Sequence, residues 1–237
     1  MLTTIESLPM IQAPIFQNES WLLHGFGVRD IAIEKYLAAF RINEAVVPTT
    51  RQVHGNKVHI LRANNKVAAS LLEADAFVTD QPNIVCFIRT ADCLPILLAD
   101  TKHHVIGAIH SGWRGTAQKI LLETMAVMEK EWGTKPADLK VAVGPAIGGH
   151  CYEVGFDVIK AFEKAGLFPG AWIEVSQKNK WYLDIAYANF HLLEQAGVLR
   201  EQIYLSLACT ACDLARFASF RKEGKKRGEQ VGFIIKK

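Results

Sequence analysis

The sequence is short of several features that define large classes of proteins. Its 237 residues contain five cysteines, a small and odd number that favours reduced thiols in a cytosol over a framework of disulfides. The longest apolar runs, at 84–88 and 94–99, fall far below the ~20 residues of a membrane-spanning helix. The N-terminus lacks the basic and apolar regions of a signal peptide. These absences predict a cytoplasmic protein with no membrane association.

Repeats, low-complexity tracts and Pro/Ser-rich linkers are also absent, so we expect one continuous domain over residues 1–237. The glycine motifs GxxxxGK[ST] and GxGxxG do not occur, which disfavours folds that bind nucleoside triphosphates or dinucleotides. The net charge is +3, and residues 221–237 alone carry +5. Because nucleic-acid-binding domains usually interleave basic and aromatic residues, we interpret this basic segment as a solvated turn and expect no nucleic-acid partner.

Half of the residues are hydrophobic, which excludes intrinsic disorder. Short runs rich in branched apolar residues predict buried strands at 58–61, 84–88, 94–99, 105–109 and 141–143. Apolar residues at steps of three and four predict helices at 116–132, 156–165 and 184–196, and Gly133, Gly166 and Gly197 stand where such helices end. The mixture indicates an α/β or α+β fold.

Three side chains with metal-binding or nucleophilic chemistry lie at strand ends or connections. They are His54 in Arg51-Gln-Val-His-Gly55, Cys93 in Thr90-Ala-Asp-Cys-Leu-Pro95 and His110 in Ile109-His-Ser-Gly-Trp-Arg-Gly115. One hypothesis is a catalytic zinc site, since three protein ligands and one open position are typical of such sites. A second is a nucleophilic Cys93–His110 pair with Asp92 or another group orienting the histidine. The third is that each of these residues is an ordinary member of the core.

Other candidates carry weaker signals. Cys209-Thr-Ala-Cys212 has CxxC spacing without a second CxxC, so packing near the C-terminus is the favoured interpretation. His150 has no evident partner in the sequence, nor have the remaining histidines. The glycine-bearing segments 112–115 and 144–149 are hypothetical anion sites, the first assisted by Arg114, or simply tight turns.

Taken together, six blocks of sequence resemble the YfiH-like family, long labelled polyphenol oxidase or laccase-domain and now described as purine nucleoside phosphorylases. The blocks appear in family order: Arg51-Gln-Val-His-Gly55, Asp75-Ala-Phe-Val-Thr79, Thr90-Ala-Asp-Cys-Leu-Pro95, His110-Ser-Gly-Trp-Arg-Gly115, Gly144-Pro-Ala-Ile-Gly148 with Cys151-Tyr-Glu-Val154, and Cys209-Thr210. The resemblance implies a layered α/β/β/α sandwich. It also implies that His54, Cys93 and His110 bind zinc.

The implied activities are phosphorolysis of adenosine, inosine, guanosine and methylthioadenosine, and hydrolytic deamination of adenosine. On this hypothesis zinc activates a water for attack on adenine C6. Arg51, Arg114 and the N–H groups near Gly115 hold phosphate, and Asp92 orients His54 or His110. The family's end motif, Phe-Phe-Ser-Tyr-Arg-Arg, reads Phe217-Ala-Ser-Phe-Arg-Lys222 here, which removes one aromatic ring and one hydroxyl.

The older oxidase label and two other activities remain as alternatives. A multicopper relay requires many histidines, chiefly in His-x-His pairs, and this sequence has eight histidines and no such pair. Copper is therefore disfavoured as the metal. The cytidine-deaminase signatures H-x-E and P-C-x-x-C do not occur either. A metal-independent cysteine hydrolase or deamidase and a non-enzymatic binding protein stay open, and we expect a monomer or weak homodimer.

Overall fold

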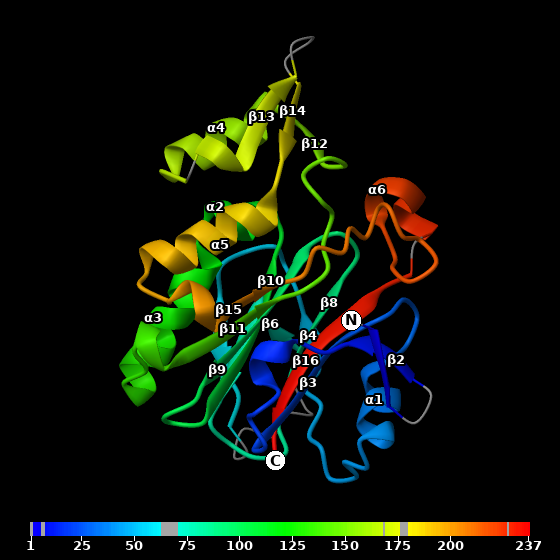
Figure 1. Cartoon of the computed structure of the whole chain (residues 1–237), viewed down its shortest axis with the longest axis vertical. Helices are drawn as coiled ribbons and strands as arrows, with labels where there is room; N and C mark the ends of the chain where they lie inside the picture. The colour runs from blue at the N-terminus through cyan, green and yellow to red at the C-terminus, as the bar shows by residue number, and fades with distance from the viewer. Residues whose placement is uncertain (1, 6–7, 63–70, 168, 176–179, 227) are drawn as a thin grey trace.

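The computed structural model describes the chain except residues 1, 6–7, 63–70, 168, 176–179 and 227. Two β-sheets form its centre (Figure 1). The five-stranded sheet runs β1 (Leu2–Ile5), β2 (Leu8–Ile11), β3 (Leu22–Gly27), β16 (Gln230–Lys236) and β8 (Val85–Thr90). The six-stranded sheet runs β15 (Ile203–Leu205), β11 (Leu139–Val143), β9 (Leu94–Asp100), β10 (Val105–Ser111), β7 (Ala76–Thr79) and β5 (Val58–Ile60). The five strands predicted from the sequence are all confirmed.

The described part of the chain forms six α-helices. They are α1 (Ile33–Ala39), α2 (Trp113–Ala117), α3 (Ile120–Trp132), α4 (Phe156–Lys164), α5 (Ile185–Gln195) and α6 (Phe220–Glu223). The predicted helices at 156–165 and 184–196 are confirmed as α4 and α5. The helix predicted at 116–132 is broken, because Lys119 adopts a left-handed conformation between α2 and α3. Gly133, Gly166 and Gly197 have the positive φ of C-terminal caps, as predicted.

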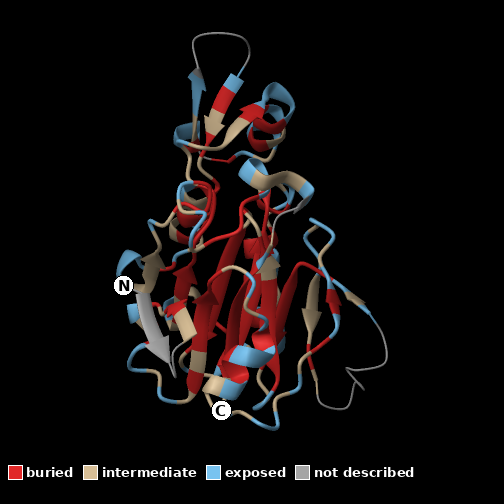
Figure 2. Cartoon of the chain, turned by 90° about the vertical axis from the view of Figure 1, so that its right-hand side faces the viewer, coloured by how far each residue is buried: buried red, intermediate tan, exposed pale blue. Residues whose placement is uncertain are grey.

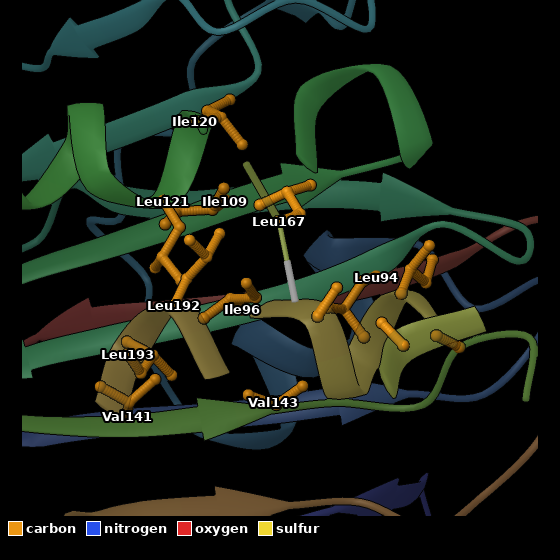
Figure 3. Close-up of a cluster of buried hydrophobic side chains, with 14 of the residues drawn as sticks. Leu94, Ile96, Ile109, Ile120, Leu121, Val141, Val143, Leu167, Leu192 and Leu193 are labelled. Carbon is orange, nitrogen blue, oxygen red and sulfur yellow. The ribbon is translucent and has the colours of Figure 1, made fainter. Parts of the chain in front are cut away.

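The core divides into three clusters that define the order of the layers. One face of the six-stranded sheet packs against α3 and α5, and Figure 3 shows Ile96 and Ile109 of the sheet beside Leu121 and Leu192 of the helices. The second cluster lies between the two sheets. The third packs the outer face of the five-stranded sheet against α1. The order helix, sheet, sheet, helix confirms the α/β/β/α sandwich.

The central strands β9 and β16 are largely apolar because each of their faces meets another layer. In β9, Ile96 and Leu98 face the helices whereas Leu97 and Ala99 face the second sheet. In β16, Phe233 packs toward α1 and Ile234 lies between the sheets. Successive side chains of a strand point to opposite faces, so a strand buried on both reads as a continuous apolar run. Figure 2 shows these central strands buried along much of their length.

A smaller unit extends beyond the sandwich at the top of Figure 1. It joins α4 to a three-stranded sheet of β12 (Glu153–Gly155), β14 (Lys180–Leu183) and β13 (Trp172–Val175). A parallel pair of two-residue strands, β4 (Thr50–Arg51) and β6 (Leu72–Glu73), lies beside the main sheets. Among the described residues no helix is both long and apolar enough to cross a bilayer.

Candidate functional site

The register of the six-stranded sheet brings distant side chains to one edge. Strand β10 is antiparallel to β7 with Ile109 opposite Ala76, so the next position, His110, lies beside Asp75. On its other side β10 pairs with β9, which places the connection that carries Cys93 at the same edge. Strand β5 runs parallel to β7, and the loop before it carries His54. Three segments far apart in the chain therefore meet at this edge.

His54, Cys93 and His110 meet there with their ligand atoms within 4.8 Å of one another. The two imidazole rings lie edge to face, with centroids 4.8 Å apart. Burial opposes ionisation of Cys93, but hydrogen bonds from His110 and His54 lower the pKa of its thiol to about 6. Burial likewise disfavours the charged form of His110, yet Asp75 and Cys93 raise the pKa of its imidazole to about 9. The site thus favours a thiolate, the form that binds metals and attacks electrophiles.

Asp75 is the carboxylate that organises this cluster. It is fully buried, and its Oδ1 lies 2.8 Å from Nδ1 of His110. The same carboxylate accepts the backbone N–H groups of Val53, His54 and Gly55 at 2.9–3.1 Å. Although burial alone would raise the pKa of Asp75, the bonds from His110 and from this loop lower it. Asp75 therefore fixes both the ring of His110 and the backbone of His54.

Backbone conformation and close packing also shape the cluster. His54 (φ 59°) and Asp92 (φ 88°) adopt positive φ, which costs a non-glycine residue about 1–3 kcal/mol and persists where surrounding bonds enforce it. A Cβ on Gly112 would lie 3.0 Å from Sγ of Cys93 and 3.1 Å from Nδ1 of His54. A side chain at residue 112 would therefore crowd the space where the donor atoms converge.

The cluster lines a cavity of about 640 Å³, a size typical of small-molecule sites. Aromatic walls come from Trp113, Tyr152 and Phe220. The remaining lining is Gln52, His54, Arg89, Thr90, Ala91, Asp92, Cys93, His110, Arg114, Ile147, Ile185, Arg221 and Glu229. Arg114 packs over the Trp113 ring at 4.2 Å from its centroid, and Arg221 packs over the Tyr152 ring at 5.1 Å. An apolar, stacking wall thus stands beside cationic groups.

The structure corrects two of the predicted positions. The carboxylate that orients His110 is Asp75, whereas Asp92 accepts hydrogen bonds from the Thr210 hydroxyl and the Arg221 amide, each at 2.7 Å. Arg51 is exposed, pairs with Glu73 at 3.1 Å and does not line the cavity. Asp92 and Arg114 line the cavity, and their role in substrate binding stays a prediction.

Sequence reasoning missed two cavity arginines. Arg89 lies on β8, and its guanidinium pairs with Glu229 at 3.2 Å. Arg221 belongs to the basic segment interpreted as a solvated turn; Arg227 of that segment lies outside the described residues. The signal for Arg221 was the Ser-Phe-Arg block itself, whose match to the family's end motif indicated a site residue.

The glycine-bearing segment 144–149 does not form the predicted anion nest. The amides of Gly144, Ile147 and Gly148 donate to Pro95 O, Asp92 O and Cys209 Sγ respectively. A Cβ at Gly144 would lie 2.4 Å from the Phe26 ring. These glycines therefore permit close packing. Gly115 does the same, since a Cβ there would lie 3.2 Å from the Gly55 carbonyl oxygen.

Comparisons with known proteins place this chain in a family. A family model described as "Multi-copper polyphenol oxidoreductase laccase" matches residues 31–237. A Deinococcus radiodurans protein named purine nucleoside phosphorylase is 40% identical over 179 residues, covering 76% of this chain and 68% of the relative. A protein from an unknown prokaryotic organism, named adenosine deaminase RL5, is 31% identical over 203 residues, covering 83% and 76%. The chain spans 60–71% of the length of seven relatives named purine nucleoside phosphorylase.

The fold has solved counterparts as well. The crystal structure of the Bacillus licheniformis hypothetical protein YfiH superimposes with a TM-score of 0.88 at 24% identity, covering 97% of this chain and 96% of that one. This likeness shows the fold, and the family model and the Deinococcus relative show the kinship. The chain belongs to the YfiH-like family, as the six sequence blocks predicted.

Proposed function

We propose that this protein is a zinc-dependent purine nucleoside phosphorylase that also deaminates adenosine. The observation that carries the proposal is the convergence of His54, Cys93 and His110 in a cavity with aromatic and guanidinium walls. Relatives named purine nucleoside phosphorylase and adenosine deaminase support the substrate class. The cytoplasmic location and the monomeric or weakly dimeric state stay predictions.

The donor set fits zinc. His110 commits Nδ1 to Asp75, which leaves Nε2 as its metal-binding nitrogen, an arrangement common to zinc-binding histidines. One sulfur and two imidazoles are ordinary zinc ligands, and three protein ligands leave a position for substrate or water. A zinc ion held here would supply Lewis acidity and an activated water near neutral pH.

The cavity residues have separate tasks in phosphorolysis, in which the bond from C1′ to the purine nitrogen breaks and a bond from C1′ to a phosphate oxygen forms. Arg114 and Arg221 hold the phosphate, because guanidinium groups bind phosphate oxygens through paired hydrogen bonds. Trp113 and Phe220 offer aromatic faces to the purine. Burial and the nearby Cys93 raise the pKa of Tyr152 to about 12, so its hydroxyl remains a proton donor.

Asp92 serves this arrangement by holding a wall of the cavity. Its two oxygens bind the Thr210 hydroxyl and the Arg221 amide, which ties the segment that carries Phe220 and Arg221 to the connection that carries Cys93. Asp92 thereby positions the Arg221 guanidinium for phosphate.

The test combines metal analysis with a nucleoside assay. Purified protein is analysed for zinc and assayed with adenosine plus phosphate, and release of adenine and of inosine is followed separately. In Cys93→Ala and His110→Ala we expect loss of the cavity zinc and of both activities with the fold retained. Cys86→Ala is the matched control, since Cys86 is a buried thiol outside the cavity. Full activity in metal-free protein would overturn the zinc role.

Arg114→Ala separates the two reactions. We expect a higher KM for phosphate with deamination preserved, because only phosphorolysis needs the anion. An equal fall in both activities would assign Arg114 to shared substrate binding or to structure.

A second function is favoured by one observation, the chain of contacts from Cys93 through His110 to Asp75. This is the arrangement of a cysteine nucleophile, its base and an orienting carboxylate, and it would suit a metal-independent hydrolase or deamidase. Alkylation of Cys93 distinguishes the two functions. Zinc would protect the thiol until a chelator removes the metal, whereas a free nucleophile reacts equally with and without the chelator.

The family model's description raises copper and polyphenol oxidation as a further alternative. Blue-copper centres also use one cysteine and two histidines, together with a weak axial ligand that is usually methionine. Within the part of the chain that the structure describes, no methionine lines the cavity, and both amide atoms of Gln52 are bonded to the Arg89 backbone. We therefore propose zinc, and the metal analysis above distinguishes it from copper.

A further inference from the structure

A second group of metal-binding side chains lies outside the cavity cluster. His150, Cys151, Cys209 and Cys212, here called the Cys3His cluster, have their ligand atoms within 4.8 Å of one another. Nε2 of His150 lies 3.2 Å from Sγ of Cys212, and that sulfur lies 3.4 Å from Sγ of Cys151. All three cysteines are free thiols. The sequence interpretation of Cys209 and Cys212 as packing residues is therefore incomplete.

Two tight turns from distant parts of the chain form this cluster. His150 and Cys151 follow the Gly148–Gly149 turn, in which the Cys151 amide donates to Gly148 O at 2.8 Å. Cys209 and Cys212 belong to a second turn, between β15 and α6, in which the Cys212 amide donates to Cys209 O at 3.3 Å. A parallel bridge between Ala146 and Cys209 joins the two segments. The backbone thus holds both ligand pairs in place.

The surroundings of Cys209 and His150 favour metal binding by the Cys3His cluster. The Gly148 amide donates to Sγ of Cys209 at 3.2 Å, a bond that stabilises a thiolate. A Cβ at Gly148 would lie 2.6 Å from Cε1 of His150, so a larger residue there would displace the ring from its present position over the turn. Zinc bonds of about 2.3 Å to sulfur and 2.0–2.1 Å to nitrogen in a tetrahedron place donor atoms roughly 3.5–3.8 Å apart. The N–S separation of 3.2 Å and the S–S separation of 3.4 Å are slightly shorter than this spacing, and all four donor atoms lie within 4.8 Å of one another.

We propose that the Cys3His cluster is a structural zinc site. Four protein ligands fill a tetrahedron and leave no position for substrate, which is the pattern of structural zinc. On binding, the three thiols release their protons to solvent and the sulfurs donate electron pairs to the ion. The proposal does not rest on the function proposed for the cavity.

The cluster is placed to hold two walls of the cavity together. Ile147 and Tyr152 flank its first ligand pair, and both line the cavity. The second pair encloses Thr210, whose hydroxyl binds Asp92, and the chain then continues to Arg221. An ion bound to both pairs would fix Tyr152 and Arg221 relative to each other.

The decisive experiment uses the full chain in a Cys93→Ala background, which removes the cavity site. We expect about one zinc ion per chain in this protein, whether or not the wild type holds a second ion in the cavity. Titration with Co²⁺ should give intense thiolate-to-metal charge-transfer bands, as expected of several sulfur ligands. Adding Cys212→Ser should weaken zinc binding by at least about 100-fold. Adding Cys86→Ala instead should leave it unchanged.

Each alternative has its own outcome. Metal-free Cys93→Ala protein that binds neither zinc nor Co²⁺, with all of its thiols reduced, would overturn the proposal. A redox pair would give a different result. Mass and thiol counting would detect a disulfide between Cys151 and Cys212, and the protein would bind no metal even after that disulfide is reduced. This outcome would overturn the proposal. The Co²⁺ spectrum needs no variant of the cluster itself, so the test stands if Cys212→Ser does not fold. Activity of Cys212→Ser reports on the cavity function separately.

Discussion

Asp75 is the residue on which the cavity cluster depends, although it is not itself among the proposed zinc ligands. Its carboxylate accepts four hydrogen bonds in a fully buried position. The side-chain amide of an asparagine in its place would point an N–H group at the N–H groups that now bond to Asp75. A buried donor without an acceptor lowers the free energy of unfolding by about 1–3 kcal/mol. Asp75 thus links the stability of the fold to the geometry of the site.

Asp75→Asn should therefore weaken both properties. We expect the free energy of unfolding to fall by about 1–3 kcal/mol and zinc affinity at the cavity to fall about 10–100-fold, measured by denaturant unfolding and competitive chelation. Asp92→Asn is the matched control, since it breaks bonds to Thr210 and Arg221 and should spare cavity zinc. Equal loss of cavity zinc in both variants would contradict the assignment.

His24 predicts how stability changes with pH. Its Nε2 accepts the Ala13 N–H at 2.9 Å in the core, and burial lowers the pKa of the imidazole from 6.5 to about 4. The imidazole binds a proton more readily in the unfolded chain than in the folded protein. The contribution of neutral His24 to the free energy of unfolding is therefore complete above pH 6.5 and is lost as the pH falls toward 4. The loss amounts to about 3 kcal/mol at 1.36 kcal/mol per pKa unit.

The check is urea unfolding of wild type and His24→Gln between pH 7 and pH 4. The free energy of unfolding of the wild type should fall more as the pH falls from 7 to 4. That of His24→Gln should be lower at pH 7 and should change less with pH. Parallel profiles for the two proteins would show that His24 does not titrate with folding.

At this scale the sequence predicts the proposed zinc ligands better than the residues that support them. His54, Cys93 and His110 were identifiable because few residue types bind metals and the surrounding blocks match a family. Asp75 was missed as the orienting carboxylate because its contact with His110 follows from the pairing of β7 with β10, which spacing along the chain does not reveal. The proximity of His150 to Cys212 was missed for the same reason, since spacing along the chain does not reveal contacts between distant segments.

Among the elements, the junction of α2 and α3 shows where periodicity misleads. The apolar pattern of 116–132 predicts a single helix, but Lys119 has φ 58° and ψ 40°. The Lys119 amide bonds to Thr116 O and its carbonyl accepts from Glu123, so one helix ends and the next begins around one residue. The three- and four-residue spacing of apolar residues continues across Lys119 because both helices bury their apolar faces on the same side of the protein.

Lys119→Gly should stabilise the protein. Glycine adopts positive φ without a Cβ clash, and after its greater flexibility in the unfolded chain is subtracted we expect a gain of about 0.5–1 kcal/mol, read from the thermal midpoint. Gln118→Gly, at the neighbouring φ of −85°, should instead destabilise. A loss of stability in Lys119→Gly would show that the lysine side chain outweighs the strain.

Whether the sequence predicted each of the other elements depended on how clear its pattern of apolar and polar residues is. The central strands were found because both of their faces are buried, which leaves an unmistakable apolar run. Helix α1 was missed because it has seven residues and no side-chain cap. The strands of the small sheet are short, and Ile173 within them is 72% exposed, so they carry no clear alternation.

For the whole molecule, the interface between the two sheets is one of three buried hydrophobic clusters in the described part of the chain. Ile234 is fully buried there, so Ile234→Ala should lower the free energy of unfolding by about 2–5 kcal/mol. Leu207→Ala, at a side chain 92% exposed, should change it by no more than about 0.5 kcal/mol. Denaturant titration of both variants tests the contrast, and similar effects would argue against this core.

Strand β16 lies between β3 and β8, two strands that precede it in the chain by more than 130 residues. A ribosome therefore completes both neighbours long before it makes the strand that joins them. Until then β3 and β8 present unpaired edges, which invite pairing with other chains. Nascent protein should accordingly depend on chaperones during this interval, and pulse-labelled chains stalled before residue 230 should aggregate more readily than released ones.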